Sequence, residues 1–473
     1  MTADPSPAKA ARPNATGGGS RSSPHLAARV GLFDATMVVM GGIIGSGIFI
    51  NPYVVAKLVH TPAMILGAWI AGGLLALIGA FIYAELADRM PEVGGQYAYI
   101  REAYHPMLGF LFGWAELFVI GAGGSAAVVV TFAEYFRELT RLTVPENWVA
   151  VLAVVLLVAI NCLGVRAGSS VQSFFMVLRI VGVALVVGFG AWFMMTPRAP
   201  GIPWRPLLDR PFSFDLLTVF GATMIPILFA YGGWQTSNFI AGEIREPRKN
   251  LPRALLLGVA GVIALYGSVN FIYVGVLTPG GLAATTTPAS EMMRHALGGL
   301  GAKLIAVAIA ISTIGFLSQA MLTFPRVYFA MAEDGVLPSA LGRLGERSRA
   351  PVAAILLQGA VIIAVVLLGT FEQILSYVVV MDWLFFGLTA SCIFVFRARD
   401  RHRAIGKQGS GSRVPAHPWT TALFTLTAWL VVLNTIYKYP RNAGVSLCIL
   451  FAGVPVYLAF QRFARRHHEM RVE

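Results

Sequence analysis

Long apolar stretches separated by short polar segments run along almost the whole chain. A helix needs roughly 20 mainly apolar residues to cross the hydrocarbon core of a bilayer, and these stretches reach about that length. The pattern predicts about twelve spans, over residues 31–56, 62–87, 106–136, 147–165, 171–195, 213–243, 253–277, 301–331, 352–369, 374–397, 418–437 and 442–462. The expected fold class is therefore an all-α integral membrane protein surrounded by a lipid bilayer.

The polar segments divide the chain into five parts. The N-terminal part is rich in Ala, Pro, Gly and Ser and lacks an apolar core, which is typical of a disordered tail and not of a signal peptide. We expect a disordered cytoplasmic tail over 1–30, a core of ten helices over 31–397, a cytoplasmic loop over 398–417, two peripheral helices over 418–462 and a cytoplasmic tail over 463–473.

Charge is scarce and unevenly placed. Only 12% of the 473 residues are charged, whereas soluble domains carry about 25%. The net charge of +13 could suggest a nucleic-acid partner, but the basic residues gather in alternate loops. The clusters are Arg245, Arg248, Lys249 and Arg253; Arg343, Arg347 and Arg349; and Arg397, Arg399, Arg401, Arg403, Lys407 and Arg413. Positive loops stay in the cytoplasm, so we expect a multi-pass protein of the plasma (cell) membrane with both termini inside and no nucleic-acid partner.

Cysteine and enzyme chemistry have no signal in the chain. Cys162, Cys392 and Cys448 all fall in apolar runs, where cysteine behaves as a small apolar residue. The sequence contains no His-Glu-x-x-His motif, paired-cysteine metal motif or Lys-containing phosphate loop. We therefore expect neither an enzyme nor a metal site, and no cofactor.

The first apolar run is unusually rich in glycine, with four glycines between Gly41 and Gly47. Glycine is a poor helix former, so the helix is expected to open here. An open backbone inside a membrane is tolerated where it is buried in protein or lines a watery cavity, and the N–H groups that start the next half-helix can hold an anion. Close helix packing through small residues is the alternative that this segment alone leaves open.

A second interruption follows about half the chain later, at Phe229–Trp234. Two broken helices in corresponding positions of two halves are typical of secondary transporters with a central substrate site. Each break lies in the first helix of a set of five, and because five is odd the second set enters from the opposite side. The pattern predicts a five-plus-five inverted repeat with broken helices 1 and 6, and with helices 11 and 12 at the periphery.

Several motifs together resemble one transporter family. They are Gly42–Phe49, Tyr83–Leu86, Gly94–Tyr99, Gly113–Trp114, Phe229–Trp234, Gly242–Ile244 and Asn250–Ala254. The first is similar to the helix-1 signature of amino acid–polyamine–organocation (APC) transporters. The segments after Phe229 are similar to helix 6 of the L-type amino acid transporter (LAT) branch. The resemblance covers roughly residues 31–400 and implies a LeuT-type fold and a small amino acid zwitterion as substrate.

The resemblance also implies how the zwitterion is bound. The backbone N–H groups of Ser46, Gly47 and Ile48 would hold the carboxylate, because a helix N-terminus favours an anion. Backbone carbonyls would accept from the ammonium group, namely those of Ile43, Phe229 and Gly232. The Phe229 ring would cover the substrate as a gate, although a packing role is the alternative. Neutral backbone dipoles avoid burying fixed charges in the membrane.

Arg179 lies in the middle of an apolar run, at a helix-5 position that often carries Lys in the family. The resemblance implies a fixed cation where sodium-coupled relatives bind sodium, with the helix-8 hydroxyls of Ser312 and Thr313 beside it. Arginine effectively cannot lose its proton, so proton coupling at Arg179 is not expected. Snorkelling to the membrane interface and a structural ion pair are the alternatives.

Four of the acidic residues within or beside the spans are candidates for functional contacts. Asp382 lies inside helix 10, near the side-chain end of the pocket that the resemblance implies, and could recognise a cation, take up a proton or be a structural carboxylate. Glu116 lies in helix 3. Glu85, near arginines, and Glu243, near Arg245, Arg248 and Lys249, are expected to make structural or gating contacts.

The combined hypothesis is a secondary transporter that moves L-amino acids, neutral ones above all, by sodium-independent exchange or facilitated diffusion. The alternative is a proton-coupled carrier of amino acids or polyamines with Asp382 and Glu116 as cation ligands. A membrane sensor that binds amino acids without moving them is a third possibility. Animal members of the branch pair with a heavy chain through a cysteine after helix 3. The segment Arg137–Asn147 contains no cysteine, so no disulfide-linked heavy chain is expected.

Overall fold

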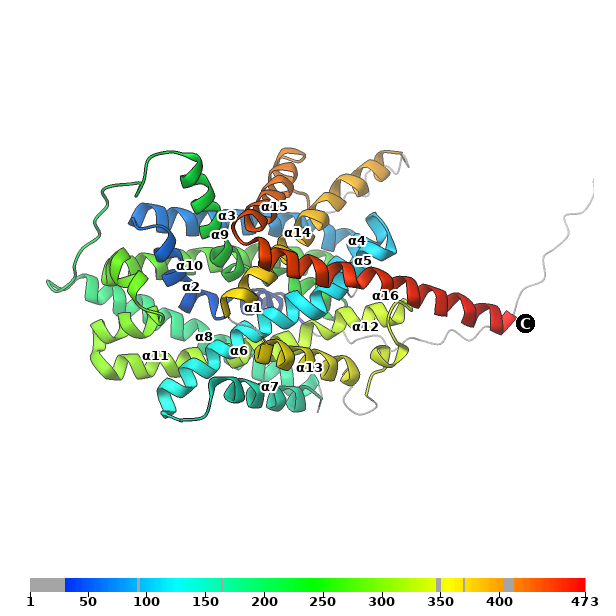
Figure 1. Ribbon diagram of the computed structural model, residues 1–473, viewed down its shortest axis with the longest axis horizontal. Helices are drawn as coiled ribbons and strands as arrows, with labels where there is room; N and C mark the ends of the chain where they lie inside the picture. Colours follow the sequence, from blue (N-terminus) through cyan, green and yellow to red (C-terminus); the bar gives the residue numbers. More distant parts are fainter. Residues whose placement is uncertain are drawn as a thin grey trace, which may run out of the picture.

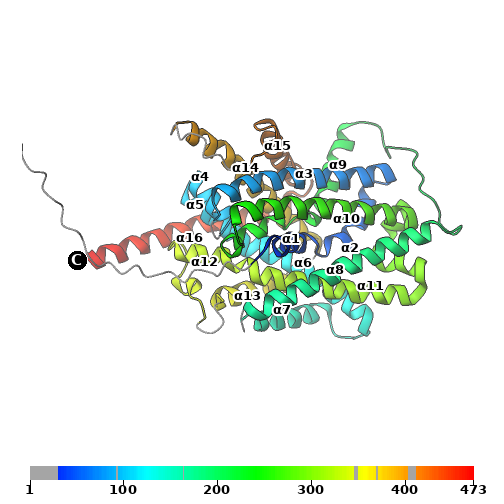
Figure 2. The same ribbon diagram turned by 180° about the vertical axis from the view of Figure 1, so that it is seen from behind.

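The computed structural model describes residues 30–91, 94–162, 165–345, 350–368, 371–402 and 412–472. Figures 1 and 2 show a bundle of helices that run mostly along the long axis of the molecule. Within the described residues, the β-structure consists of one isolated parallel bridge between Val30 and Ile244. Most of the predicted N-terminal tail and part of the 398–417 loop lie outside the described residues.

The helices follow the predicted spans closely. Their bounds are α1 Leu32–Ile43, α2 Gly47–Leu58, α3 Pro62–Arg89, α4 Gln96–Ala103, α5 Pro106–Ala115, the π-helix η1 Glu116–Ile120, α6 Gly121–Thr140, α7 Glu146–Cys162, α8 Val165–Met194, α9 Phe214–Ala230, the 3₁₀-helix η2 Trp234–Glu243, α10 Pro247–Ala284, α11 Pro288–Thr323, α12 Pro325–Glu333, the 3₁₀-helix η3 Ser339–Gly342, α13 Val352–Leu368, α14 Phe371–His402, α15 Trp419–Lys438 and α16 Pro440–Val472. In the described part of the chain, ten helical segments are long and apolar enough to cross a membrane, and α7 and α13 are shorter apolar helices. The prediction of an all-α membrane protein is confirmed.

The predicted first and sixth spans are each two helical pieces. The first consists of α1 and α2, which are separated at Ile44–Ser46, and the sixth consists of α9 and η2, which are separated at Tyr231–Gly233. Both interruptions therefore occur where the glycines predicted them. At the C-terminus, α16 continues through the predicted tail to Val472 as one helix.

The helices form two packed groups. One group contains α1, α2, α3, α9, η2 and α10, and the other contains α6, α7, α8, α11, α12 and α13. Figures 1 and 2 show α3, α9 and α10 on one side of the bundle and α7, α11 and α13 on the other. The two broken helices lie in the first group, where they face the second.

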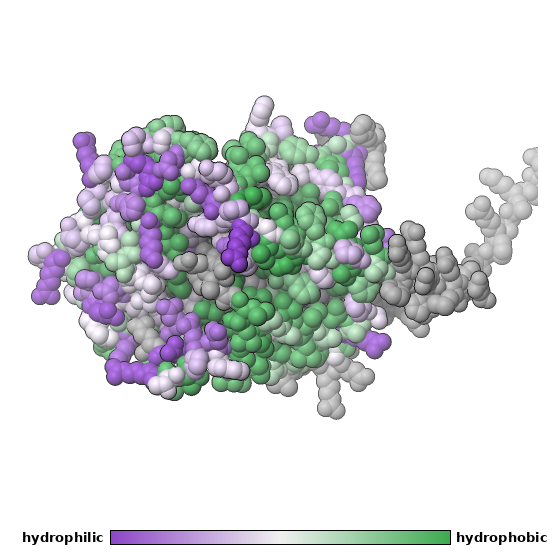
Figure 3. All heavy atoms as spheres, viewed as in Figure 1, coloured by the Kyte–Doolittle hydropathy of each residue, from purple (hydrophilic) through white to green (hydrophobic). Residues whose placement is uncertain are grey.

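The surface fits a lipid environment. Large apolar side chains are exposed on the outward faces of the spans, among them Leu152, Leu156, Trp192, Leu257 and Leu356. Figure 3 shows hydrophobic residues over much of one face, with hydrophilic residues gathered mainly toward its left-hand end. Such a distribution would be unfavourable in water and is favourable against lipid chains.

Arginines gather at one end of the bundle. At this end, here called the arginine-rich end, α1 begins and α3, α12 and α14 finish. The Glu85 carboxylate accepts hydrogen bonds from Arg89, from Arg397 and from the backbone N–H of Val414. Its side chain is fully buried, and the expected contacts between Glu85 and nearby arginines are therefore present.

Candidate substrate site between the broken helices

The break in the first span exposes backbone donors. α1 ends at Ile43 and α2 begins at Gly47, and the first backbone N–H after the break with an acceptor in the described residues is that of Phe49, which donates to Ser46 O over 3.0 Å. The N–H groups of Ser46, Gly47 and Ile48 therefore remain free to bind an anion at the start of α2. The Ser46 hydroxyl is also buried without a partner in the described residues.

The break in the sixth span lies directly against the first. Gly233 has φ = +98°, a conformation that favours glycine. A Cβ on Gly233 would lie 2.0 Å from the carbonyl oxygen of Gly42, and a Cβ on Gly42 would lie 2.5 Å from that of Gly233. Both positions therefore require glycine, because the two open backbones touch.

A cavity of ≈ 70 Å³ lies between these breaks and the second helix group. A single water needs roughly 10–15 Å³ by the same kind of measure, so the cavity has room for a small solute. The lining residues predicted as site residues are Ile43, Ser46, Gly47, Phe229, Gly232 and Asp382. Ile48 is fully buried and does not line the cavity.

Aromatic and aliphatic side chains form most of the rest of the cavity wall. Phe229 lies in the last turn of α9 and is half-buried. Its ring shares the cavity lining with Phe316 and Phe324 of the second helix group and with Trp383 of α14. The backbone carbonyl of Phe229 accepts the N–H of Gly232 over 3.1 Å, which leaves one of its two lone pairs for a ligand.

Asp382 is the one charged side chain among the described residues that line the cavity. A Cβ on Gly232 would lie 3.7 Å from Asp382 Oδ2, so the carboxylate faces the break in the sixth span. Gln235 Nε2 approaches Oδ1 at 3.5 Å, a long contact, and no basic side chain of the described residues pairs with it. The prediction placed Asp382 near the substrate side chain, and the structure puts its carboxylate near Gly232, which is also an expected ammonium acceptor.

Tyr266 of α10 joins the two broken helices, which sequence analysis did not predict. Its hydroxyl lies 3.0 Å from the carbonyl oxygen of Ile43 and 3.3 Å from that of Ala230. Among the expected acceptors for the ammonium group, the Ile43 carbonyl therefore already accepts two hydrogen bonds, this one and one from the N–H of Gly45 over 2.8 Å. A tyrosine in an apolar run has many possible partners, and only packing identifies this pair.

Arg179 is buried in the bundle and binds the first break. Its Nη1 lies 2.7 Å from the carbonyl oxygen of Gly41 and 3.0 Å from that of Ile44. Its exposure of 3% and these contacts contradict the snorkelling alternative. No acidic side chain among the described residues forms an ion pair with Arg179, so these residues do not provide the structural ion pair that was the second alternative.

Neither of the two hydroxyls expected beside Arg179 is hydrogen-bonded to it in the described residues. Thr313 Oγ1 donates within its own helix, toward the carbonyl oxygens of Ile309 and Ala310. The Ser312 hydroxyl is buried and has no partner in the described residues. On α11 the guanidinium instead lies against Gly315, where a Cβ would be 2.8 Å from Nη2.

Gln319 of α11 is a cavity residue that the sequence did not indicate. Its Nε2 donates to the carbonyl oxygen of Val38 over 2.8 Å, and a Cβ on Gly41 would lie 2.4 Å from its Oε1. The glycine thus admits a side chain from the second helix group. The contact holds α1 against α11 on the side of the cavity toward the arginine-rich end.

Glu243 makes a similar contact nearer that end. The sequence suggested Arg245, Arg248 and Lys249 as its partners, and this is wrong: Arg326 binds Glu243 Oε1 through Nε and Nη2, both over 3.2 Å. The backbone carbonyl of Glu243 also accepts the N–H of Val30. Both broken helices are therefore fastened to the second helix group near the arginine-rich end.

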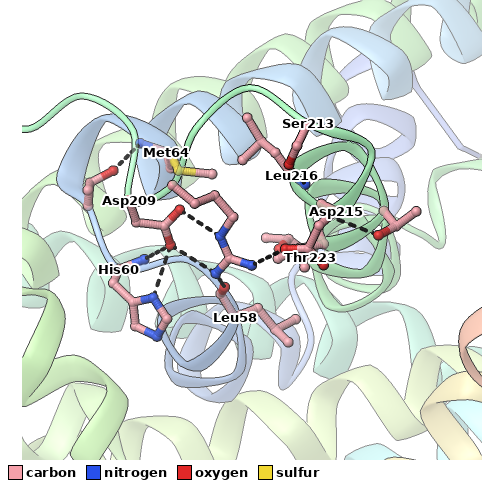
Figure 4. A network of polar contacts seen from close by, with 12 residues as sticks. Leu58, His60, Met64, Asp209, Ser213, Asp215, Leu216 and Thr223 are labelled. Carbon is pink, nitrogen blue, oxygen red and sulfur yellow. Dashed lines mark hydrogen bonds and ion pairs between the residues drawn. The ribbon is translucent and has the colours of Figure 1, made fainter.

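A different polar network at the opposite end includes Leu58, His60, Asp209 and Asp215 (Figure 4). Arg210 is its centre. The guanidinium donates to Asp209, to Asp215 in the first turn of α9 and to the carbonyl oxygen of Leu58 at the end of α2. His60 also contacts Asp209, with its backbone N–H 3.1 Å and its Nδ1 3.0 Å from Oδ2. Although partial burial opposes it, these hydrogen bonds from Arg210 and His60 hold the pKa of Asp209 below its usual value. The network joins the end of α2 to the start of α9, which are the parts of the two broken helices farther from the arginine-rich end.

The fold and site define a class of protein: a multi-pass membrane transporter with a solute cavity between two broken helices. The comparison with family models agrees. Residues 30–460 match the amino acid permease family model. The chain belongs to this family, within the APC superfamily and its LAT branch.

Known relatives span nearly the whole chain. The serine/threonine exchanger SteT of Bacillus subtilis is 31% identical over 92% of this chain and 98% of its own length. The human large neutral amino acids transporter small subunit 2 is 28% identical over 94% of this chain and 82% of its own. The human Asc-type amino acid transporter 1 is 28% identical over 91% and 82%. The protein is therefore an amino acid transporter and not an enzyme.

Proposed function

We propose that the protein exchanges small neutral L-amino acids across the plasma membrane by alternating access, independently of sodium. Without a counter-substrate the same movement would give facilitated diffusion. The free N–H groups at the start of α2, opposite a single carboxylate, carry the proposal. They supply a positive and a negative end to one small cavity, as a zwitterion needs. The exchange activity named for SteT supports the same class of transport.

The carboxylate of the substrate would bind to the N–H groups of Ser46, Gly47 and Ile48. They lack acceptors in the described residues, and the helix dipole of α2 adds positive potential. The ammonium group would lie between the carbonyls of Ile43, Phe229 and Gly232, with Asp382 beside it. This assignment explains why an unpaired acid is tolerated in the cavity, because the substrate itself provides the cation.

The remaining wall favours an uncharged side chain. Beyond Asp382, the lining on the second helix group and α14 is mainly apolar, with Ile120, Val128, Phe316, Phe324 and Val378. If the ammonium group occupies Asp382, no second acid remains in the described lining for a cationic side chain. The small volume further favours substrates of the size of alanine, serine or threonine.

Sodium independence rests on Arg179. Its guanidinium binds two carbonyl oxygens of the first break, which is a role that a bound cation plays in a sodium-coupled carrier. A permanent charge fixed there would make a sodium ion unnecessary. The hydroxyls of Ser312 and Thr313, on the adjoining helix, would lie beside this cation. Ser312 fits this role better, because its hydroxyl has no partner in the described residues.

Alternating access would move the helix group of α1, α2, α3, α9, η2 and α10 against the other group. The contacts of Gln319 with Val38 and of Arg326 with Glu243 cross between the groups and would break when the arginine-rich end opens. Phe229 would cover the substrate during the change. By the distribution of basic residues this end is cytoplasmic, which would put both termini inside. The segment Arg137–Asn147 lacks a cysteine, so the proposal includes no disulfide-linked heavy chain.

Transport by purified protein in proteoliposomes tests the proposal. Labelled neutral, cationic and aromatic amino acids would be offered to empty vesicles and to vesicles loaded with unlabelled amino acid, with and without sodium or proton gradients. We expect uptake of small neutral amino acids that internal amino acid stimulates and that sodium does not. Accumulation driven by sodium, or uptake of polyamines, which lack the carboxylate, would contradict it. Binding without uptake would indicate a sensor.

A further inference from the structure

An apolar groove lies at the end of the bundle opposite the arginine-rich end. It has a volume of ≈ 450 Å³ and lies between the start of α3, the start of α9 and residues 207–212, here called the groove segment. Each of these elements contributes three lining residues, and none of the nine has a polar side chain. Two of them, Met64 and Leu216, are labelled in Figure 4. The groove shares no lining residue with the substrate cavity in the described part of the chain.

Polar contacts fix the groove segment in place. The carbonyl oxygen of Leu207 accepts the Thr61 hydroxyl over 2.9 Å. The charged side chains of the segment, Asp209 and Arg210, pair with each other, and Arg210 also pairs with Asp215 in the first turn of α9. These contacts hold the segment between the two helices. They also leave it without an unpaired charge that could attract a polar ligand.

Protein covers the apolar side chains of the groove only in part. Phe212 is 79% exposed, and Leu208 and Leu217 are exposed as well. Apolar cavities of roughly 150 Å³ stay dry and bind small hydrocarbons, because water finds no hydrogen-bond partners in them. The same chemistry applies to this larger groove, so its ligand should be a hydrocarbon.

The groove continues into the lipid-facing surface of α3. Gly67 lines the groove and is exposed. Ile70 and Leu74 follow at i+3 and i+7 on the same face of the helix and are exposed too. The helix is long and apolar enough to cross a membrane. An acyl chain of the bilayer therefore reaches the groove along a continuous apolar surface.

We propose that the groove binds an acyl chain of a membrane phospholipid. The bound chain packs between the groove segment, α3 and α9. It thereby supports the polar network of Asp209 and Arg210 that joins α2 to α9. Lipid binding here requires only that the spans lie in a bilayer, and it holds whichever solute the central cavity carries.

Gly67 offers a way to fill the groove from within. A Cβ at Gly67 meets nothing within 4 Å in the described residues, so the side chain of Gly67→Leu can take the place of the lipid without displacing protein atoms. Gly188→Leu is the matched control. Gly188 is also exposed on a spanning helix, α8, and a Cβ there likewise meets nothing within 4 Å, but it does not line the groove.

Photolabelling of the purified protein in vesicles tests the site. The vesicles contain phosphatidylglycerol and a phosphatidylethanolamine whose acyl chain carries a diazirine, and mass spectrometry locates the labelled residues. In the wild type we expect the label to concentrate on the groove segment and the starts of α3 and α9. Gly67→Leu should lower this labelling roughly tenfold, which corresponds to about 1.4 kcal/mol of affinity, whereas Gly188→Leu should leave it unchanged.

Melting temperature in detergent gives a second readout. Added phosphatidylethanolamine should raise the melting temperature of the delipidated wild type and of Gly188→Leu, but not that of Gly67→Leu. Leu208→Gln keeps the test decisive if Gly67→Leu does not fold. It places an amide in the groove from an exposed position of the groove segment, so it should also lose the label and the stabilisation.

Two results would overturn the proposal. Label spread evenly over the exposed faces of the spans, or unchanged in Gly67→Leu and Leu208→Gln, would show that the groove holds no acyl chain. Complete protection of the groove segment from the lipid probe in the wild type would show that protein covers the groove instead.

Discussion

Nη1 of Arg179 lies 2.7 Å from the carbonyl oxygen of Gly41, a residue 138 positions earlier in the chain. With its second bond to Ile44, this contact satisfies two carbonyls that the break in the first span leaves without helical partners. A charge-assisted hydrogen bond contributes about 1.5–3 kcal/mol. The open form of the first span thus depends on a residue of the fifth.

Replacement of Arg179 should therefore impair transport more than folding of the spans. We expect Arg179→Gln to lower the exchange rate roughly tenfold or more, since tenfold corresponds to about 1.4 kcal/mol. Arg179→Lys should retain more activity because it keeps the charge but loses the forked geometry. Rates in proteoliposomes at matched protein content would measure both. Equal activity of wild type and Arg179→Gln would exclude the role.

Gly233→Ala should prevent the two breaks from touching. An added Cβ would meet the backbone of Gly42, and the φ of +98° is unfavourable for alanine. We expect a clear decrease in melting temperature and loss of substrate binding, measured by thermal unfolding in detergent with and without amino acid. Gly267→Ala is the matched control, because a Cβ at Gly267 meets nothing within 4 Å. If both variants behave alike, the close approach does not matter.

Asp382→Asn separates two interpretations of the acid. If Asp382 binds the ammonium group, KM should rise by a similar factor, roughly tenfold, for every α-amino acid, since one charged hydrogen bond is weakened by about 1.5 kcal/mol. If it recognises a cationic side chain, cationic substrates alone should be lost. Competition of unlabelled amino acids with one labelled neutral substrate gives both answers. From the contact with Gly232 we expect the first result.

The network around Arg210 predicts how stability depends on pH at the end opposite the arginine-rich end. The pKa of Asp209 is lower in the folded protein than in the unfolded chain. Its contribution to stability is therefore fully present above the unfolded value of about 3.9 and is lost as the pH falls through the lower, folded value. Asp209→Asn should melt at a lower temperature than wild type at neutral pH.

In acid the difference between Asp209→Asn and wild type should shrink. Thermal unfolding of both proteins at a series of pH values is the measurement. The pKa of a free aspartate is about 3.9. A difference in melting temperature that stays constant from neutral pH to well below this value would contradict the assignment.

Much of the fold follows from local properties of the sequence. The lengths of the apolar runs predicted the spans, because hydrophobicity and bilayer thickness fix how long each helix must be. The glycines at Gly41–Gly47 and at Gly232 and Gly233 predicted both breaks, because a missing Cβ weakens a helix wherever it occurs. Six of the seven expected substrate residues line the cavity. Five of them lie at the breaks, and the sixth, Asp382, is an acid within a span.

The tertiary structure decided which groups meet. Tyr266 reaches Ile43 across 223 positions, Gln319 reaches Val38 across 281, and Glu243 binds Arg326 instead of the basic residues beside it in sequence. Asp382 likewise lies near Gly232. Such pairs depend on how each helix is rotated and packed against its neighbours, and hydropathy carries no information on that rotation. The sequence alone therefore determined where the helices open, and packing determined what each opening binds.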